Sequence, residues 1–243
     1  MNGTRLLRRV FALLLLLALI TGMTGCFTIT ISPRYVTLSD DYTTLTATPD
    51  SEKVYRIEID NMSFTNSKDV TIDIAYSDTP SVEAVVSEDL LDYGFKITMN
   101  NGVLRVGPSK HLEIRTGRFE LKIRARFDEI DFSGGYDVTV DAGGAQSLSL
   151  NVSGAANGSV ENLYVSDFDA KISGAGSFVL SGAADKATIH ISGAGDMTIA
   201  VVDVLEAKIS GIGSIEYFGS PTVTQSVSGL GTVSQKSTEL PSA

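Results

Sequence analysis

Pairs of carboxylates are the residues of this chain whose type and spacing could support catalysis. Asp167 and Asp169 stand two positions apart in an alternating segment, so both would project from one face of a strand, as an acid and base pair requires. The other candidates are Asp128-Glu129-Asp131 and the pair Asp137 and Asp141. Because all of them fall at expected strand ends or turns, where solvated acids are common, the sequence predicts a protein without a catalytic site.

Metal and phosphate chemistry also lack support in the sequence. His111 and His190 have no partner at a spacing suited to a metal ion, and no Gly-Lys-Ser/Thr phosphate loop occurs. Calcium-binding β-rolls need an aspartate in every repeat. The positions that would serve here hold one carboxylate among four side chains, which are Ser177, Asp196, Ser214 and Thr232. We therefore expect no metal and no cofactor.

The charges limit the possible partners. Lys122, Arg124 and Arg126 alternate along one strand face and could meet an anionic polymer, although pairing with nearby acids is the commoner role of such a stripe. Three of the 19 Lys and Arg lie within the segment 1–25, which contains no acid. The chain from Cys26 onward therefore has a formal charge of 16 − 29 = −13, which disfavours binding to nucleic acid.

The N-terminal segment 1–25 has the pattern of an export signal. Arg5, Arg8 and Arg9 precede an apolar stretch over residues 10–20, which is short for a membrane span. Met23-Thr24-Gly25-Cys26 then resembles the lipobox of bacterial lipoproteins, with Met23 where leucine is commoner. The resemblance implies cleavage before Cys26 and a lipid on its thiol. We thus expect anchoring to a membrane of the bacterial cell envelope, on the extracytoplasmic side. With no second cysteine, no disulfide can form within the chain.

A five-fold repeat defines the elements of the C-terminal half. Its serines are Ser153, Ser173, Ser192, Ser210 and Ser228, whose numbers differ by 20, 19, 18 and 18. A period near 20 without helical periodicity predicts a β-solenoid, in which each repeat forms one coil. The Ser-Gly pairs and the glycines after them are the expected structural corners, where glycine permits a bend or close backbone approach. These corner residues are Ser173, Gly174, Gly176, Ser192, Gly193, Gly195, Ser210, Gly211, Gly213, Ser228, Gly229 and Gly231.

Two columns of apolar residues should fill the coils, because equivalent residues of stacked coils lie above one another at roughly 4.8 Å. One column is Val152, Ile172, Ile191, Ile209 and Val227, and the other is Phe178, Met197, Ile215 and Val233. With about 18–20 residues in each coil, the interior should be packed with side chains rather than open as a pore. Serine hydroxyls at the corners could satisfy backbone groups that the bends leave unpaired.

The N-terminal half also reads as strands. Residues 54–59, 70–74 and 119–127 alternate apolar and polar side chains, and Asn101-Gly102 between two such runs predicts a hairpin. One helical turn or two is expected from Ser87 to Tyr93, with Ser87 as the N-cap.

Several of these segments resemble the head GIN domain family of auto-transporter adhesin heads. The similarity rests on Tyr217, Gly219 and Pro221 before the final repeat Val227-Ser228-Gly229-Leu230-Gly231, and on residues 87–92 followed by Asn101-Gly102-Val103-Leu104. It covers about residues 54–235. The resemblance implies an all-β, right-handed parallel β-helix-like solenoid in a bacterial surface protein, with no established biochemical activity.

The sequence thus predicts a signal peptide (1–25), a lipidated cysteine with a tether or first strand (26–51), a head GIN solenoid (52–235) and a polar tail (236–243). The expected function is that of a lipid-anchored envelope protein with a non-enzymatic head, an adhesin or an interaction surface for a glycan or protein. The alternative is a carbohydrate-binding or carbohydrate-active β-helix, in which Tyr164, Tyr136 or Tyr217, exposed in a row on a coil face, could bind the glycan. A third possibility is pairing with another protein through an exposed end of the solenoid.

Overall fold

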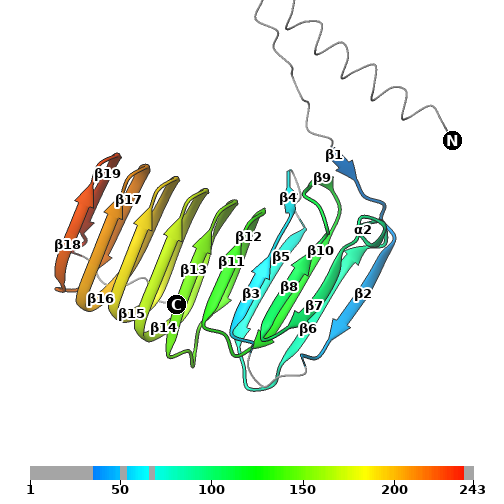
Figure 1. The fold of residues 1–243 in the computed structure, drawn as a ribbon, viewed down its shortest axis with the longest axis horizontal. Coiled ribbons are helices and arrows are strands. Elements are labelled where there is room, and N and C mark those ends of the chain that lie inside the picture. The colour runs from blue at the N-terminus through cyan, green and yellow to red at the C-terminus, as the bar shows by residue number, and fades with distance from the viewer. Residues whose placement is uncertain (1–34, 50–53, 66–68, 238–243) are drawn as a thin grey trace, which may run out of the picture. The chain divides into compact units, whose positions relative to one another are not determined.

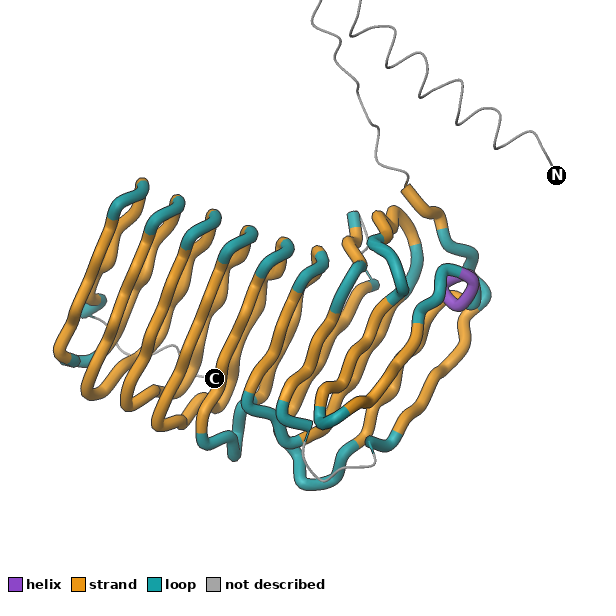
Figure 2. Tube along the Cα trace, viewed as in Figure 1, coloured by secondary structure: helices purple, strands orange, loops and turns teal. Residues whose placement is uncertain are grey.

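The computed structural model describes residues 35–49, 54–65 and 69–237, which belong to one compact unit, Arg34–Ala243. The expected signal peptide and Cys26 lie outside the described residues. Strands make up most of the described chain, and they stack into a solenoid in which short loops join successive strands at one edge of the C-terminal coils (Figures 1 and 2). The predicted all-β solenoid is confirmed.

Each C-terminal coil has two sides, which belong to two facing parallel sheets. The chain runs through β11 (Glu129–Phe132), β12 (Gly135–Asp141), β13 (Ser147–Val152), β14 (Ala155–Ile172), β15 (Ala175–Ile191), β16 (Ala194–Ile209), β17 (Ile212–Phe218), β18 (Thr222–Val227) and β19 (Leu230–Gln235). The first sheet contains β12, β17, β19 and the first halves of β14 to β16. The second contains β11, β13, β18 and the second halves of β14 to β16.

The register between coils confirms the predicted coil length. Ala155 pairs with Ala175, Ala175 with Ala194, and Ala194 with Ile212, so the sequence offset between successive coils is 20, then 19, then 18. The next pair, Ile212 with Leu230, repeats the offset of 18.

Both predicted apolar columns lie inside the coils. Ile172, Ile191 and Ile209 are fully buried, and Phe178 and Met197 are 1% exposed in the facing column. The interior is therefore a packed core, as expected. The columns lose their cover only in the last coil, where Val227 is exposed.

The N-terminal half departs from the sequential stacking that the repeat suggests. One coil consists of β3 (Arg56–Ile59), β4 (Met62–Phe64) and β5 (Val70–Tyr76), and the next consists of β8 (Val103–Gly107), β9 (Leu112–Thr116) and β10 (Phe119–Ala125). β3 pairs with both β8 and β11, and β5 with both β10 and β12. The earliest coil thus lies between two later ones.

Antiparallel strands cover the N-terminal end of the solenoid. β2 (Tyr42–Ala47) pairs with β6 (Ser81–Ser87), which pairs with β10, and β7 (Lys96–Asn100) pairs with β8. A short strand, β1 (Tyr35–Thr37), runs parallel to β9. The predicted hairpin at Asn101-Gly102 is confirmed, with φ of 48° and 78° at its two turn residues.

The predicted helix is present as α2 (Asp89–Asp92), but its expected cap is wrong. Glu88 occupies the N-cap position and no side chain caps the helix. Ser87 instead ends β6, and its hydroxyl oxygen lies 3.4 Å from that of Ser39. The strand pairing of β6 continues through Ser87, which removes this residue from the helix terminus.

Candidate functional site

The Ser-Gly pairs lie between strands at one edge of the coils, and in the last four repeats a further glycine is the second residue of the next strand. A Cβ at Gly193 would meet the carbonyl oxygen of Gly174 in the preceding coil at 1.9 Å. The same distance separates a Cβ at Gly174 from Gly154, and one at Gly211 from Gly193. Glycine is thus required at this position because the coils approach closely.

The corner N–H groups are already hydrogen bonded to the preceding coil. The amides of Ser192 and Gly193 both donate to the carbonyl of Ile172, at 2.9 and 3.1 Å. The serine hydroxyls contribute little by comparison, since that of Ser173 lies 3.4 Å from the Val152 carbonyl. That of Ser210 lies 3.5 Å from His190 Nε2 instead. Amides that are bonded in this way do not form a phosphate cradle.

The outer face of the first sheet carries a column of short polar side chains, one from each strand, which we call the polar ladder. Asn157 Nδ2 donates to Asp137 Oδ1 at 3.2 Å, and the Ser177 amide donates to Asn157 Oδ1 at 3.0 Å. The Ser214 amide donates to Asp196 Oδ1 at 2.9 Å. The members of the polar ladder are Asp137, Asn157, Ser177, Asp196, Ser214 and Thr232.

Small residues flank the polar ladder in the same sheet. Ala155, Ala175 and Ala194 form an exposed column on one side, and Thr139, Ser159, Val179 and Thr198 lie in the column on the other. Strands about seven residues long, stacked six deep at about 4.8 Å, give a face of roughly 600 Å². The first sheet therefore presents a flat surface in which hydrogen-bonding groups lie close to the backbone.

Charged residues dominate the outer face of the second sheet. Asp167 and Asp169 are exposed and share one face, as their spacing indicates, and the Ser166 hydroxyl donates to Asp167 at 2.8 Å. The next column, Lys171, His190 and Lys208, stacks basic side chains in three successive coils. Since acids and bases occur together on this exposed face, it is a solvated surface of mixed charge.

The second sheet continues toward the N-terminal end in a network of ion pairs. Arg56 contacts Glu129 at 2.7 Å, and Arg105 pairs with Glu58, the only charged side chain that is buried in the described part of the chain. Asn151 Nδ2 donates to both Glu129 and Asp131, at 3.0 and 2.7 Å. These contacts link four adjacent strands, β8, β3, β11 and β13.

Asp131 is the acid in this network whose pKa is shifted. Burial raises the pKa of Asp131, and the carboxylates of Glu129 and Glu58 add to the increase. The hydrogen bond from Asn151 and the charge of Arg56 oppose it. A raised folded-state pKa means that the charged carboxylate destabilises the fold above that pKa and that this effect disappears as the pH falls toward about 4.

Asp131→Asn should therefore increase the free energy of unfolding at pH 7, and the gain should shrink toward zero below about pH 4, where aspartate is neutral in both states. Urea denaturation at a series of pH values measures the difference. Asp203→Asn, at an exposed position, gives the same change in net charge as a control. A gain in Asp131→Asn that is equal at pH 3.5 and pH 7 would contradict this assignment.

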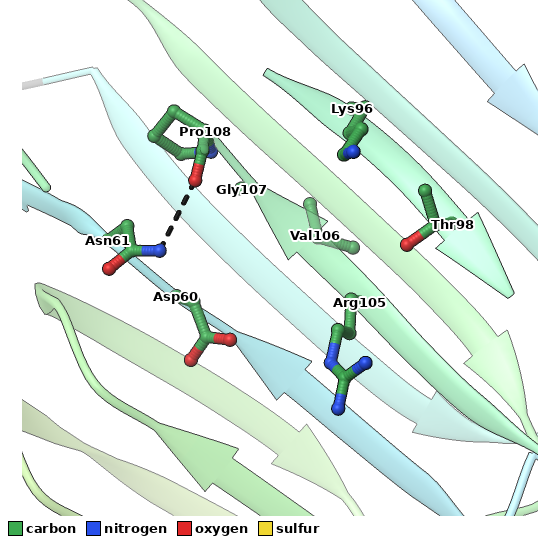
Figure 3. Close-up of a pocket in the computed structure, with 8 residues that line it drawn as sticks. All are labelled: Asp60, Asn61, Lys96, Thr98, Arg105, Val106, Gly107 and Pro108. Atoms are coloured by element: carbon green, nitrogen blue, oxygen red, sulfur yellow. Dashed lines mark hydrogen bonds between the residues drawn. The ribbon is translucent and has the colours of Figure 1, made fainter. Parts of the chain in front are cut away.

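A small pocket lies beside this network, between the turn after β3 and the β7–β8 hairpin (Figure 3). It has a volume of about 110 Å³ and is lined by Asp60, Asn61, Lys96, Thr98, Arg105, Val106, Gly107 and Pro108. Asn61 has a φ of 64° and donates from Nδ2 to the Pro108 carbonyl at 3.2 Å. Ser133 donates to Asp60 at 2.8 Å. Most polar groups of the pocket thus already have partners within the protein.

The basic stripe and the tyrosines do not form the sites that their sequence allowed. Arg124 and Arg126 are paired with Asp73 and Asp78, each at 2.6 Å, so two of the three charges of the stripe are already matched by acids. Tyr136 is 6% exposed, and its hydroxyl donates to the Ile59 carbonyl inside the coil. Tyr217 packs partly against the core, whereas Tyr164 is 75% exposed. The expected exposed row of tyrosines is therefore wrong.

Metal-binding groups are likewise missing from what the structure describes. No cluster of three His, Cys, Asp or Glu side chains suited to a metal occurs within residues 35–49, 54–65 and 69–237. His111 is exposed and lies 3.4 Å from Glu113. Across the same residues, no helix has the length and apolarity needed to cross a membrane.

Comparison with known families decides the relationship. Residues 63–237 match the family model described as "Putative auto-transporter adhesin, head GIN domain". The chain belongs to this family. The match covers both the sequential coils of this head GIN domain and most of its rearranged N-terminal half, and it agrees with the resemblance seen in the sequence. A comparison with curated protein sequences gives no match.

One solved structure shares the fold of this head GIN domain, and two others show a weaker similarity to it. A putative adhesin from Bacteroides fragilis is 20% identical, with a TM-score of 0.61 and coverage of 83% of this chain and 100% of the other. A putative adhesin from Parabacteroides distasonis is 23% identical, with a TM-score of 0.48 and coverage of 84% and 100%. A protein from the same organism described as a putative lipid binding protein is 16% identical, with a TM-score of 0.48 and coverage of 84% and 100%.

Sequence reasoning missed three features of this head GIN domain. The polar ladder had a signal, because Ser177, Asp196, Ser214 and Thr232 follow the corner glycines at a constant spacing, but these four positions were interpreted only as possible calcium ligands. The ion-pair network and the pocket had none, since both depend on β3 lying beside β8, which is distant from it in the chain.

Proposed function

We propose that this chain is a lipid-anchored protein of the bacterial cell envelope, held on the extracytoplasmic side by a lipid on Cys26, with a solenoid head that acts as a non-enzymatic adhesive surface. The observation that carries the adhesive role is the flat outer face of the first sheet with its polar ladder. Family membership supports an adhesin-like protein of the cell surface.

The polar ladder suits contact with an extended partner, such as a protein or glycan surface. Its side chains are short, and several are held by hydrogen bonds between adjacent coils, so little conformational entropy is lost on binding. The face of roughly 600 Å² is somewhat smaller than the ~800 Å² that each partner contributes to a standard interface. A single head should therefore bind weakly, and many heads on one cell would add avidity.

The arrangement of the acids supports a non-enzymatic head. Asp167 and Asp169 are exposed on an open sheet face rather than enclosed. A catalytic acid is usually kept protonated by burial, and this face provides none. Asp137 belongs to the polar ladder, where Asn157 donates to it. Asp131 and Glu129 are engaged by Arg56 and Asn151.

The anchor is tested by changing its cysteine. Cys26→Ala in the full chain should abolish incorporation of radiolabelled palmitate and move the protein from the membrane to the soluble fraction. Globomycin, which inhibits lipoprotein signal peptidase, should make the unprocessed precursor of the unaltered chain accumulate. Membrane fractionation that is the same with and without Cys26 would rule out the lipid anchor.

The adhesive face is tested with one substitution on each sheet. Ser177→Arg places a long cationic side chain on the polar ladder, and Thr188→Arg makes the same change in charge on the second sheet of the same coil. Both positions are exposed, so both variants should fold. Binding of head-coated beads to matrix proteins and a glycan array should fall about tenfold for Ser177→Arg and remain for Thr188→Arg. Equal binding by both variants would refute the proposed face, and turnover of any glycan would refute the non-enzymatic role.

A further inference from the structure

The last coil leaves the edges of both sheets open. β18 pairs with β16 on one side, and β19 pairs with β17. Neither strand has a ladder partner on its outer edge among the described residues. The apolar columns end here with Val227 at 43% exposure, and Leu230 at the last corner is 76% exposed. Figure 1 shows these two strands forming one end of the solenoid.

The opposite end is built differently: antiparallel strands and a helix cover its apolar core, although β2 and β7 each have a single strand partner among the described residues. β2, β6, β7 and α2 close the N-terminal coils, and Leu90 of α2 is fully buried. Phe95 packs its ring against Phe119 at a centroid distance of 5.9 Å. A head-to-tail stack would place the exposed apolar columns of the last coil against an end whose apolar core is already covered.

The chemistry of the open end favours a second copy of the same chain. Exposed sheet edges are normally protected by lysine, proline, bulges or inward-pointing charges. No charged residue occurs from Gly219 to Gln235, although 20% of the whole chain is charged. Pro221 lies before β18 rather than within it, and the pairing of β18 and β19 contains no bulge. The protein is strongly acidic, with a net charge of −10. A neutral end lets two such molecules meet without like-charge repulsion.

We propose that two copies associate through their C-terminal coils about a two-fold axis perpendicular to the solenoid axis. Such an axis places each edge strand antiparallel to an edge strand of the second copy, so the backbone groups at the open edges can pair. The exposed ends of the two apolar columns then cover each other. Because the contact uses the same surface on both molecules, it closes at a dimer.

The size of the end suggests a reversible dimer. Six-residue strands are about 20 Å long, and the two sheets are about 10 Å apart, so the contact is well below a standard interface in area. Main-chain hydrogen bonds from two strand pairs add to the apolar contact. The competing occupant is the segment 238–243, which is short and contains Pro241.

The test measures association of the compact unit, residues 34–243, by sedimentation equilibrium from low micromolar to several hundred micromolar. We expect a monomer–dimer equilibrium. Gln225→Lys with Val227→Lys introduces charges at exposed positions of the edge strand and should weaken dimerisation at least about tenfold. Ile212→Lys is the control for a lysine at an exposed apolar position away from the end, because Ile212 is 58% exposed and lies one coil back from Leu230. It should dimerise as the unaltered protein does.

Melting curves at the lowest concentration show whether each variant folds. Truncation after Ser237 shows whether a second copy or the segment 238–243 covers the open end. The dimer should persist without residues 238–243. A monomer at all concentrations would overturn the proposal, as would a monomer that dimerises only after truncation, since the tail would then cover the end. Open-ended polymers, or equal loss of the dimer in Ile212→Lys, would overturn the two-fold end-to-end contact.

Discussion

Gly193→Ala should destabilise the solenoid by about 3 kcal/mol or more. The new Cβ would lie 1.9 Å from the Gly174 carbonyl oxygen and 2.5 Å from that of Ser173. Both atoms are backbone of the preceding coil, and the Ala194 amide donates to the Gly174 carbonyl at 2.9 Å, so neither can move without breaking the stack. For a domain of this size we expect the midpoint of thermal unfolding to fall by roughly 6–12 °C, which circular dichroism can measure.

Gly143→Ala is the control for this prediction. The closest atom to a Cβ at Gly143 is the carboxylate oxygen of Asp141, at 3.1 Å, which belongs to a side chain that can rotate. Both variants add one methyl group to a glycine whose φ is not in the left-handed region. If Gly193→Ala melted within a degree or two of Gly143→Ala, close stacking of the corners would not be the reason for glycine there.

The repeat allowed the C-terminal coils to be predicted because the same contact recurs in each of them. Each corner glycine stacks on the corner glycine of the coil before it, which fixes the register. Once the register is fixed, the column from Val152 through Ile172, Ile191 and Ile209 to Val227 follows from counting. Local sequence and long-range pairing give the same answer in this region.

The N-terminal half could not be predicted in the same way. Alternation identified β3, β5 and β10 as strands, but it carries no information about which strands pair. The coil from β3 to β5 has a neighbour on each side, and both neighbours come from later segments of the chain. Stacking the coils in sequence order therefore gives the wrong arrangement. The ion-pair network and the pocket depend on this order and were missed for that reason.

Tyr136 shows where the sequence held a signal that was not used. It has the same parity as Val138 and Val140 in β12, and all three side chains point into the coil. Parity therefore predicts a buried tyrosine, and its hydroxyl then needs a partner, which the Ile59 carbonyl supplies. Burial raises the pKa of Tyr136, as expected for a phenol removed from water. The neighbouring Asp137 points outward, into the polar ladder.

The second large loss of stability is expected for Phe119→Ala, which removes a side chain from the covered N-terminal end. Phe119 is fully buried at the start of β10, and its ring lies 5.2 Å from Phe64 in β4 and 5.9 Å from Phe95 next to β7. One side chain thus joins the displaced coil, the coil that stacks on it and the cover at the end. Removing it should cost about 3–5 kcal/mol, because the rigid strands around it cannot collapse into the cavity.

Urea denaturation measures this loss, and Tyr93→Ala, at a side chain that is 45% exposed, should change stability by no more than about 0.5 kcal/mol. Hydrogen exchange adds a spatial test. Stability in a solenoid spreads mainly between neighbouring coils, so Phe119→Ala should lose amide protection first in residues 54–125 and last in β15 and β16. Uniform loss of protection across all coils would show instead that the head unfolds as one cooperative unit, with its stability set by the N-terminal end.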